Sequence, residues 1–352
     1  MIVLDTNQLR SAVFPHGAVM NMLTKIAELN ERPLAIPRMV AVEDIAHHQH
    51  AIEDALKDAR KAAGVLDHAL GSELMTEIRR LSGSRAAATR WEALDAVFKI
   101  LPTPPGAAEE ALRREANRQP PAEQTWVDSN GKSVKARGAR DVTIWLSILE
   151  AARSTDGEVW FVSQDADFGR DDFHPLLRQE AQRYLRDGHT RLRLLNGGIE
   201  QLLSELAERS DEPKELGTWL QADVIGEAVS AQLVGSHTFF RLMPESDILP
   251  ARGMTSTGTE VSVQEVRRRR TYRVGGHTWV SAQLRCRGLK KYSFLRGSYF
   301  ADEQGEMERW WAGTEFSCDV TVLAEVLSTG LSSIEITSVG HLAITATSQS
   351  KS

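Results

Sequence analysis

Acidic side chains follow two apolar segments of this sequence, at the point where each segment ends. The first segment, residues 1–4 (MIVL), runs into Asp5, and the second, residues 159–163 (VWFVS), is followed by Asp165 and Asp167. Glu43 and Asp141 stand near the beginnings of two segments with helical spacing. If the apolar segments are parallel strands of one sheet, the carboxylates meet at its carboxyl edge, where open α/β folds bind their ligands.

Carboxylates brought this close cannot all ionise at neutral pH unless a positive charge sits among them. A hard divalent cation, Mg²⁺ or Mn²⁺, takes oxygen ligands and supplies that charge. One or two such ions can activate water and stabilise the leaving oxygen of a phosphodiester. We therefore predict a metal site formed by Asp5, Glu43, Asp141 and Asp165, with Asp167 in support. The simpler alternative for each acid is that it caps the following helix.

The segments around these acids alternate between strand and helix. Residues 8–29 have helical spacing, residues 33–37 (PLAIP) are typical of a short strand, and a second helix begins near residue 39. Residues 141–152 indicate another helix, residues 191–195 a further strand and residues 199–208 a closing helix. Strands that are apolar throughout are typical of a parallel sheet covered on both faces. We predict a three-layer α/β/α domain with a parallel sheet over residues 1–208.

Two other regions interrupt or follow this pattern. Residues 52–135 are predicted as an insertion, helical to about residue 116, with a polar loop or hairpin at residues 119–137. Residues 209–232, which are mixed and helical in character, are predicted as a linker. Over residues 233–352, short alternating segments separated by turns such as Gly275-Gly276 indicate a separate antiparallel β domain. This all-β domain is a candidate surface for substrate or a partner.

Composition limits the class of protein. A chain of 352 residues is expected to form two domains, and its net charge of −6 means that nucleic-acid binding would need a local basic patch. The first strand begins at residue 2, no apolar run is long enough for a membrane span, and we expect a cytoplasmic protein without membrane contact. Cys286 and Cys318 are expected to be free thiols.

Polar and basic side chains near the acids could position a substrate. Lys135, Arg137 and Arg140 precede Asp141, where a helix start and cations suit a phosphate, although a solvated loop explains them equally well. The remaining candidates are hydroxyl and amide side chains that could orient metal-bound water or cap a helix, and they are Thr6, Asn7 and Ser163.

A second basic patch lies in the predicted β domain. Residues 267–270 are four consecutive arginines, and aromatic residues such as Tyr272 and Trp279 lie nearby in the sequence. Basic groups and aromatic platforms on a sheet suit single-stranded nucleic acid, through phosphate contacts and base stacking. The alternative is that the arginines protect an edge strand and the aromatics pack a core.

The N-terminal part resembles the PIN-domain nucleases. The matching motifs are LDTN with Asp5, RMVAVED with Glu43, GARDVTIW with Asp141, and FVSQDADF with Asp165 and Asp167. Ser163 supplies the hydroxyl that the family places two residues before the last acidic position. The resemblance implies a five-stranded parallel sheet, and acids that bind Mg²⁺ or Mn²⁺ and cleave RNA by metal-activated water. The long helical insertion and the β appendage depart from compact PIN domains.

We therefore predict a metal-dependent nuclease, an endoribonuclease acting on single-stranded RNA, with Asp5, Glu43, Asp141 and Asp165 as the catalytic residues. One alternative is a phosphatase with an Asp nucleophile, but that class needs a second Asp where this chain has Asn7. The other is a regulatory or nucleic-acid-binding module with a degenerate metal site. A second copy of the chain or a regulatory protein stays open as a partner.

Overall fold

The computed structural model of the protein describes residues 1–10, 14–15, 17–70, 73–122, 125–127, 133–135, 138–234, 255–296 and 308–351. The chain forms two compact units. The first comprises Met1–His16 and Met20–Ala207, and the second comprises Gly17–Val19 and Glu208–Ser352. In the described residues, we find no helix that combines the length and apolar character needed to span a membrane.

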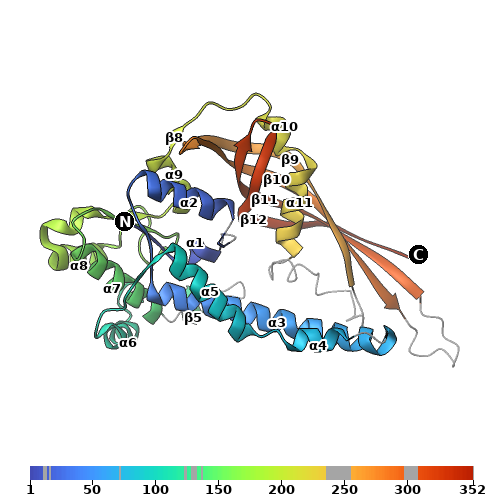
Figure 1. Ribbon diagram of the computed structural model, residues 1–352, viewed down its shortest axis with the longest axis horizontal. Helices are drawn as coiled ribbons and strands as arrows, with labels where there is room; N and C mark the ends of the chain where they lie inside the picture. Colours follow the sequence, from blue (N-terminus) through green and yellow to red (C-terminus); the bar gives the residue numbers. More distant parts are fainter. Residues whose placement is uncertain are drawn as a thin grey trace. The chain divides into compact units, whose positions relative to one another are not determined.

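The first unit, coloured from blue to yellow-green in Figure 1, contains a five-stranded parallel sheet with the order β3-β2-β1-β6-β7. Its strands are β1 (Ile2–Leu4), β2 (Leu34–Pro37), β3 (Lys99–Leu101), β6 (Val159–Val162) and β7 (Leu192–Leu195). Every residue of β1, β2 and β6 is buried, which explains why these segments are apolar throughout. The predicted parallel α/β fold is confirmed.

The connections between the strands determine where the helices lie. The chain passes from β1 to β2 through α2 (Ala18–Leu29), and from β2 to β3 through α3 (Arg38–Leu70), α4 (Leu74–Arg79) and α5 (Gly83–Val97). It returns to β6 through α6 (Ala107–Asn117) and α7 (Ala139–Arg153), and reaches β7 through α8 (Pro175–Leu185) and the 3-10 helix η1 (Arg186–Arg191). Right-handed crossovers in opposite directions along a sheet place their helices on opposite faces.

Three local features differ from the expectations. The helix predicted over residues 8–29 is divided into α1 (Thr6–Arg10) and α2, with Pro15 and Gly17 between them. Proline interrupts a helix because it lacks an amide hydrogen. Strand β3 lies within the segment predicted to be a helical insertion, and it pairs with β2 at the edge of the sheet. The predicted loop or hairpin contains β4 (Thr125–Val127) paired antiparallel with β5 (Ser133–Lys135).

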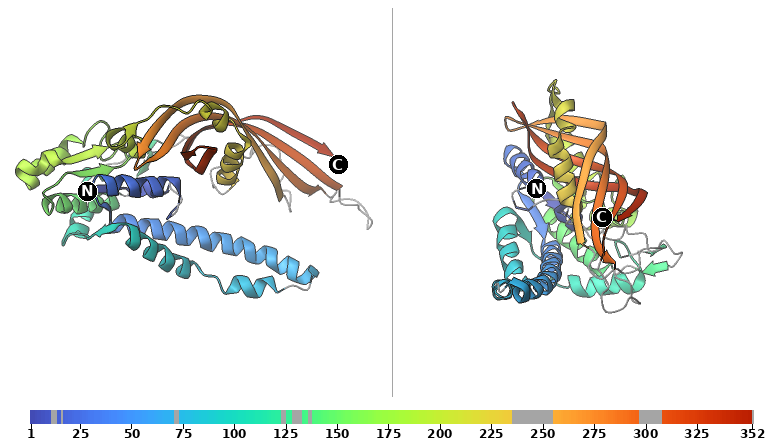
Figure 2. Two further views of the ribbon diagram at one scale, coloured as in Figure 1. Left: turned by 45° about the horizontal axis from the view of Figure 1, so that its top comes forward. Right: turned by 90° about the vertical axis from the view of Figure 1, so that its right-hand side faces the viewer.

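The helical insertion is built on one long helix. Helix α3 has 33 residues, which corresponds to about 50 Å at 1.5 Å per residue. Helix α5 packs beside α3 (Figure 2), and its first turn is capped by Ser82, whose Oγ accepts a hydrogen bond from the Arg85 amide at 3.3 Å. The first unit ends with α9 (Gly198–Leu206), which packs on β6 and β7.

The second unit is an antiparallel sheet with the order β12-β11-β10-β9-β8. Four of its strands are 20 to 22 residues long, and they are β9 (Thr255–Val274), β10 (His277–Arg296), β11 (Glu308–Leu327) and β12 (Gly330–Lys351). The β9–β10 turn uses Gly275 and Gly276, both with positive φ, as a tight hairpin requires. The predicted antiparallel C-terminal sheet is confirmed, with fewer and longer strands than the alternating segments indicated.

Helices complete the core of the second unit. The segment predicted as a linker, residues 209–232, contains the end of β8 (Glu208–Arg209), all of α10 (Leu216–Leu220) and most of α11 (Asp223–Val234). Helix α11 packs against both β9 and β12. Apolar side chains of the two helices and the sheet form one buried cluster, which includes Leu216, Ile225, Val280, Leu284 and Val322. Cys286 and Cys318 lie in the same cluster as free cysteines.

Candidate metal centre

The acids that follow β1 and β6 lie at adjacent strand ends. Strands β1 and β6 pair in parallel with Leu4 opposite Val162, and the Asp5 amide donates to the Val162 carbonyl at 3.1 Å. The chain leaves β1 toward β2 on one side and leaves β6 toward β7 on the other. Such a switch point opens a crevice at the carboxyl edge of a sheet. Asp5, Asp165 and Asp167 are therefore placed where ligands bind in this class of fold.

Hydrogen bonds fix both carboxylate oxygens of Asp5. Its Oδ1 accepts from the Thr6 amide at 2.7 Å, and its Oδ2 accepts from Ser163 Oγ at 2.6 Å and from Asn7 Nδ2 at 3.1 Å. The residue is only 5% exposed. Asp5 is therefore held in one orientation before any ligand arrives.

Ser163 connects Asp5 to the second acidic segment. Its hydroxyl is fully buried, donates to Asp5 and accepts from the Asp165 amide at 3.1 Å. The Asp167 amide in turn donates to Asp165 Oδ1 at 2.9 Å. These bonds explain why a hydroxyl residue at the end of β6 matters for the spacing of the acids.

Glu43 reaches the same neighbourhood from helix α3. Its Oε2 accepts from Thr6 Oγ1 at 2.9 Å, and its Oε1 accepts from Arg140 Nη1 at 2.6 Å. Arg140 lies in the first turn of α7, directly before Asp141. The Arg140 guanidinium, predicted to contact substrate, is thus paired with an acid of the site while remaining half exposed.

The pKa values of three carboxyls show that the acids share one environment. Burial raises the pKa of Asp141 to about 8, and the negative charges of Asp165, Asp5, Asp167 and Glu43 raise it further in the same direction. Burial raises the pKa of Asp5 to about 6 against the opposing hydrogen bond from Ser163. Burial and the charge of Asp165 raise the pKa of Asp167 to about 7. The negative charge of this cluster is therefore only partly compensated, by the Arg140–Glu43 ion pair.

The donor set suits a hard cation, although the side chains are not arranged around one. Among the residues that the structure describes, no three His, Cys, Asp or Glu side chains form a metal-binding group. Mg²⁺ usually retains several waters and takes one or two protein carboxylates, so a complete protein cage is not needed. Asp167 Oδ2 is buried and has no hydrogen-bond partner in the described part of the chain. An unsatisfied carboxylate oxygen in an acidic cluster fits a cation ligand.

The predicted substrate-binding residues divide into three groups. Thr6, Asn7 and Ser163 lie among the acids, and Arg140 contacts Glu43. Lys135 is the last residue of β5. Arg137 lies outside the described residues.

Two glutamines that sequence reasoning did not select support the site. Gln8 is buried, and its Nε2 donates to Asn7 Oδ1 at 2.6 Å and to Gln164 Oε1 at 3.4 Å. Its Oε1 accepts from the Ile199 amide at 3.2 Å, at the start of α9. Gln8 thereby holds Asn7, which donates to Asp5. Their position in the sequence could have indicated this role, since Gln8 directly follows Asn7 and Gln164 directly follows Ser163.

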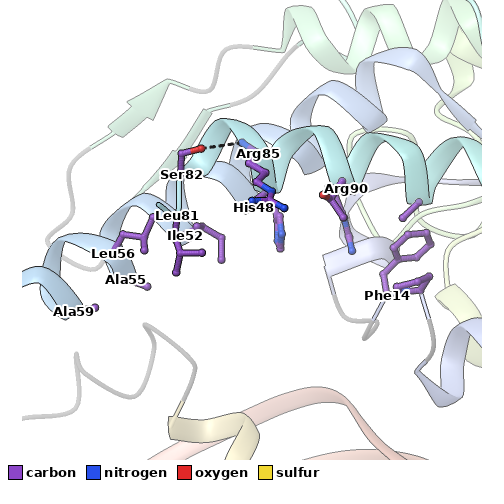
Figure 3. Close-up of a pocket in the computed structure, with 14 residues that line it drawn as sticks. Phe14, His48, Ile52, Ala55, Leu56, Ala59, Leu81, Ser82, Arg85 and Arg90 are labelled. Carbon is purple, nitrogen blue, oxygen red and sulfur yellow. Dashed lines mark hydrogen bonds between the residues drawn. The ribbon is translucent and has the colours of Figure 1, made fainter. Parts of the chain in front are cut away.

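A separate apolar groove lies on the helical insertion. It has a volume of about 540 Å³ and is lined mainly by apolar side chains of α3 and α5, including Ile52 and Leu56, with Leu81 and Phe14 (Figure 3). Arg90 also lines the groove, and its Nε binds Asp44 at 2.7 Å. The five acids are not among the lining residues, so this groove is distinct from the candidate metal centre.

Comparison with known proteins identifies the first part of the chain. A family model described as PIN domain matches residues 2–168, the segment that carries all five acids. Neither the curated proteins nor the solved structures include a significant match to this chain.

Proposed function

The N-terminal part of this chain is a PIN-like domain, a class of generally metal-dependent nucleases, and we propose that it is a ribonuclease that uses Mg²⁺ or Mn²⁺. The proposed ligands are Asp5, Glu43, Asp141 and Asp165, with Asp167 in support. The proposed substrate is single-stranded RNA, cleaved internally.

One observation carries this proposal. Carboxyls from β1, α7 and the β6 end share an environment that raises the pKa of Asp5 to about 6 and the pKa of Asp141 to about 8. A cluster of acids built only for stability would be paired with cations, because uncompensated buried charge destabilises a fold. The described basic groups beside this cluster are Arg140, which pairs with Glu43 at 2.6 Å, and His47, which lies 3.8 Å from Glu43 and is charged only if protonated, and both contact Glu43 rather than Asp5 or Asp141. The remaining negative charge favours binding of a divalent cation.

Each side chain then has a definable role. A divalent cation bound here would provide activation of water and neutralise charge on the phosphodiester. Asp5 presents a carboxylate oriented by Thr6 and Ser163. Asp141 must lose a proton to act as a ligand, since burial raises its pKa to about 8. Arg140 positions Glu43 and, being half exposed, can also contact a substrate phosphate.

The phosphatase alternative fits the geometry less well. That class carries a second acid at the position where this chain has Asn7, and Asn7 Nδ2 donates to Asp5 Oδ2. The hydrogen bonds to both oxygens of Asp5 fix its orientation and leave lone-pair capacity free for a metal ion. The missing second acid is therefore what disfavours the phosphatase.

The test is cleavage of labelled RNA and DNA, single-stranded and double-stranded, with Mn²⁺ or with a chelator. We expect cleavage of single-stranded RNA with Mn²⁺ and none with the chelator. Asp5→Asn keeps the size of the side chain, removes its charge and should lower the rate at least a hundredfold, the scale of losing one preorganised electrostatic group. Glu227→Ala, at an exposed position in α11, is the control and should cleave normally. Full activity of Asp5→Asn would refute the assignment. A correctly folded wild-type protein that shows no Mn²⁺-dependent cleavage would favour the alternative of a regulatory module with a degenerate metal site.

A further inference from the structure

The four consecutive arginines of β9 do not form one patch, because they project to different sides of the sheet. Val280, Ala282 and Leu284 of β10 belong to the buried cluster under α10 and α11. The residues between them, Ser281 and Gln283, therefore face the other side of the sheet, since side chains alternate along a strand. We call the side of the sheet that bears Ser281 and Gln283 the open face; it is covered at Ser281, which is 8% exposed, and accessible at Arg268 and Arg270 on the neighbouring strand.

Strand register assigns two arginines to the open face. Arg270 lies opposite Ser281 and Arg268 lies opposite Gln283 in the β9–β10 ladder. Directly opposed residues of an antiparallel pair share a face. Arg268 and Arg270 are both exposed, and neither has an ion pair or a side-chain hydrogen bond with any residue that the structure describes.

The neighbouring arginines are neutralised. Arg269 points to the helix side, where its Nε binds Glu212 at 2.8 Å. Arg267 binds Glu265 at 3.0 Å and Asp319 at 3.2 Å. Arg285 shares Asp319, and Arg287 pairs with Glu315. Arg268 and Arg270 are thus two neighbouring positive charges on the open face that have no acidic partner among the described residues.

Two aromatic residues of the predicted patch are buried on this same side of the sheet. Tyr272 lies opposite Trp279, and they are 1% and 2% exposed, so neither offers a ring on which bases could stack. Arg268 and Arg270 are two residues apart on one strand, a separation of about 7 Å at 3.4 Å per residue. Recognition on this face would therefore act through backbone phosphates, which attract arginine in a way that does not depend on sequence.

We propose that Arg268 and Arg270 form a binding surface for the phosphate backbone of single-stranded RNA, separate from the candidate metal centre. The choice of RNA as ligand rests on the proposed function of the first unit. Charge complementarity supports it, because Arg268 and Arg270 are exposed and unpaired among the described residues, whereas the chain as a whole carries a net charge of −6. A negatively charged protein that must hold a polyanion needs such a local patch.

The experiment measures binding of a labelled single-stranded RNA to the full chain in chelator, over a range of salt concentrations. Each neutralised phosphate of a single strand contributes about 0.7 to the slope of log K against log salt. Arg268→Ala/Arg270→Ala should reduce that slope by about 1.4 and weaken binding by roughly tenfold or more at low salt. Arg268→Lys/Arg270→Lys keeps both charges and should retain most of the slope.

Arg269→Ala/Arg273→Ala is the matched control. It removes two exposed arginines from the same strand, and register places Arg273 opposite Thr278, on the helix side. This variant should bind RNA with an unchanged slope. An equal loss in both double-alanine variants would show an effect of net charge alone and overturn the proposal, as would an unchanged slope in Arg268→Ala/Arg270→Ala. If polyglutamate bound to Arg268 and Arg270 more tightly than RNA does, the ligand of this surface would be an acidic protein and the proposal would be overturned.

These results are independent of the nuclease proposal. Binding in chelator requires no cleavage, so RNA binding that depends on Arg268 and Arg270 would support this inference even if the chain cut no RNA. Conversely, cleavage lost in Asp5→Asn together with unaltered binding in Arg268→Ala/Arg270→Ala would support the metal centre and refute this surface.

Discussion

Ser163 is the residue through which the two acidic segments of the site are joined. Its hydroxyl donates to Asp5 at 2.6 Å and accepts from the Asp165 amide at 3.1 Å. The first of these bonds lowers the pKa of Asp5, in opposition to burial. A small polar side chain thereby keeps a buried carboxylate closer to its ionised form.

Replacing Ser163 with Ala should therefore raise the pKa of Asp5 above about 6 and move the acidic limb of the pH–rate profile for RNA cleavage to higher pH. The loss of the buried hydrogen bond should also lower the free energy of unfolding by about 1–3 kcal/mol. Ser147→Ala is the matched control, because Ser147 is also buried but bonds only to the Thr143 carbonyl within α7. If both variants lose stability and neither shifts the pH profile, Ser163 has only a structural role.

Protons compete with the metal at the same carboxyls. The pKa values of Asp5, Asp167 and Asp141 are raised to about 6, 7 and 8, so part of the site is protonated near neutral pH. Metal ligands must be deprotonated, and binding therefore releases protons. Affinity for Mn²⁺ should rise steadily from pH 6 to pH 8 in titration calorimetry, with proton release visible in buffers of different ionisation enthalpy. Affinity that is constant across this range would contradict the assigned ligands.

The positions of the acids could be expected from the sequence because each follows a buried strand or lies in the first two turns of a helix, whereas their role as metal ligands stays a prediction. The Arg140–Glu43 pair could not, since the two residues are 97 positions apart and no local pattern links them. The role of Gln8 could not be predicted either, because its hydrogen-bond partners are Gln164, which follows β6, and the Ile199 amide of α9. Local sequence indicates which side chains reach an edge, whereas their partners depend on the assembled sheet.

At the scale of elements, α11 shows how closely a helix can approach a sheet. A Cβ atom added at Gly226 would lie 2.1 Å from the Val261 carbonyl oxygen of β9, which is backbone and cannot rotate away. The absence of a side chain at this position is therefore required for the packing of α11.

Gly226→Ala should destabilise the second unit by about 1–3 kcal/mol, the usual cost of overpacking, although alanine favours a helix. Thermal unfolding followed by circular dichroism measures the effect. Glu227→Ala changes the exposed neighbouring residue of the same helix and should leave stability within about 0.5 kcal/mol. A stabilised Gly226→Ala variant would show that α11 does not pack on β9 in this way.

Some elements were beyond sequence reasoning for identifiable causes. Strand β3 has three residues, one of them exposed, and lies between helical segments, so it has neither length nor alternation to mark it. The segment of α10 and α11 was predicted to be helical but was assigned to a linker, because its apolar residues match a core formed by distant strands. Strands β1, β2 and β6 were predictable because burial on both faces makes them apolar throughout.

At the scale of the whole molecule, the two units have separate cores, and we expect two thermal transitions. The raised pKa of Asp141, about 8 against 3.8 in an unfolded chain, means that the folded metal-free unit holds a proton that the unfolded chain releases. The stability of the first unit should therefore fall as pH rises from about 4 to about 8.

Scanning calorimetry with chelator over this pH range tests the sign. Saturation with Mn²⁺ at about a hundred times its Kd should raise one transition by about 5–10 °C, corresponding to about 2.7 kcal/mol, and leave the other unchanged. In Asp141→Asn, both the pH dependence and the response to Mn²⁺ should weaken. A first unit that becomes more stable toward pH 8 without metal would contradict the raised pKa.

Three irregular steps in β9 have a consequence for how this strand tolerates change in length. At these steps Arg267, Gln264 and Thr257 are extra residues with no counterpart on β10. Removing Arg267 would restore regular pleating at its own step and keep the two flanking segments of the strand in phase. Removing Ser262, which is paired with Arg287, would instead turn Val261 to the other side of the sheet, since a slip of one residue exchanges the two sides of a strand. Length variation in β9 should therefore be confined to these three steps.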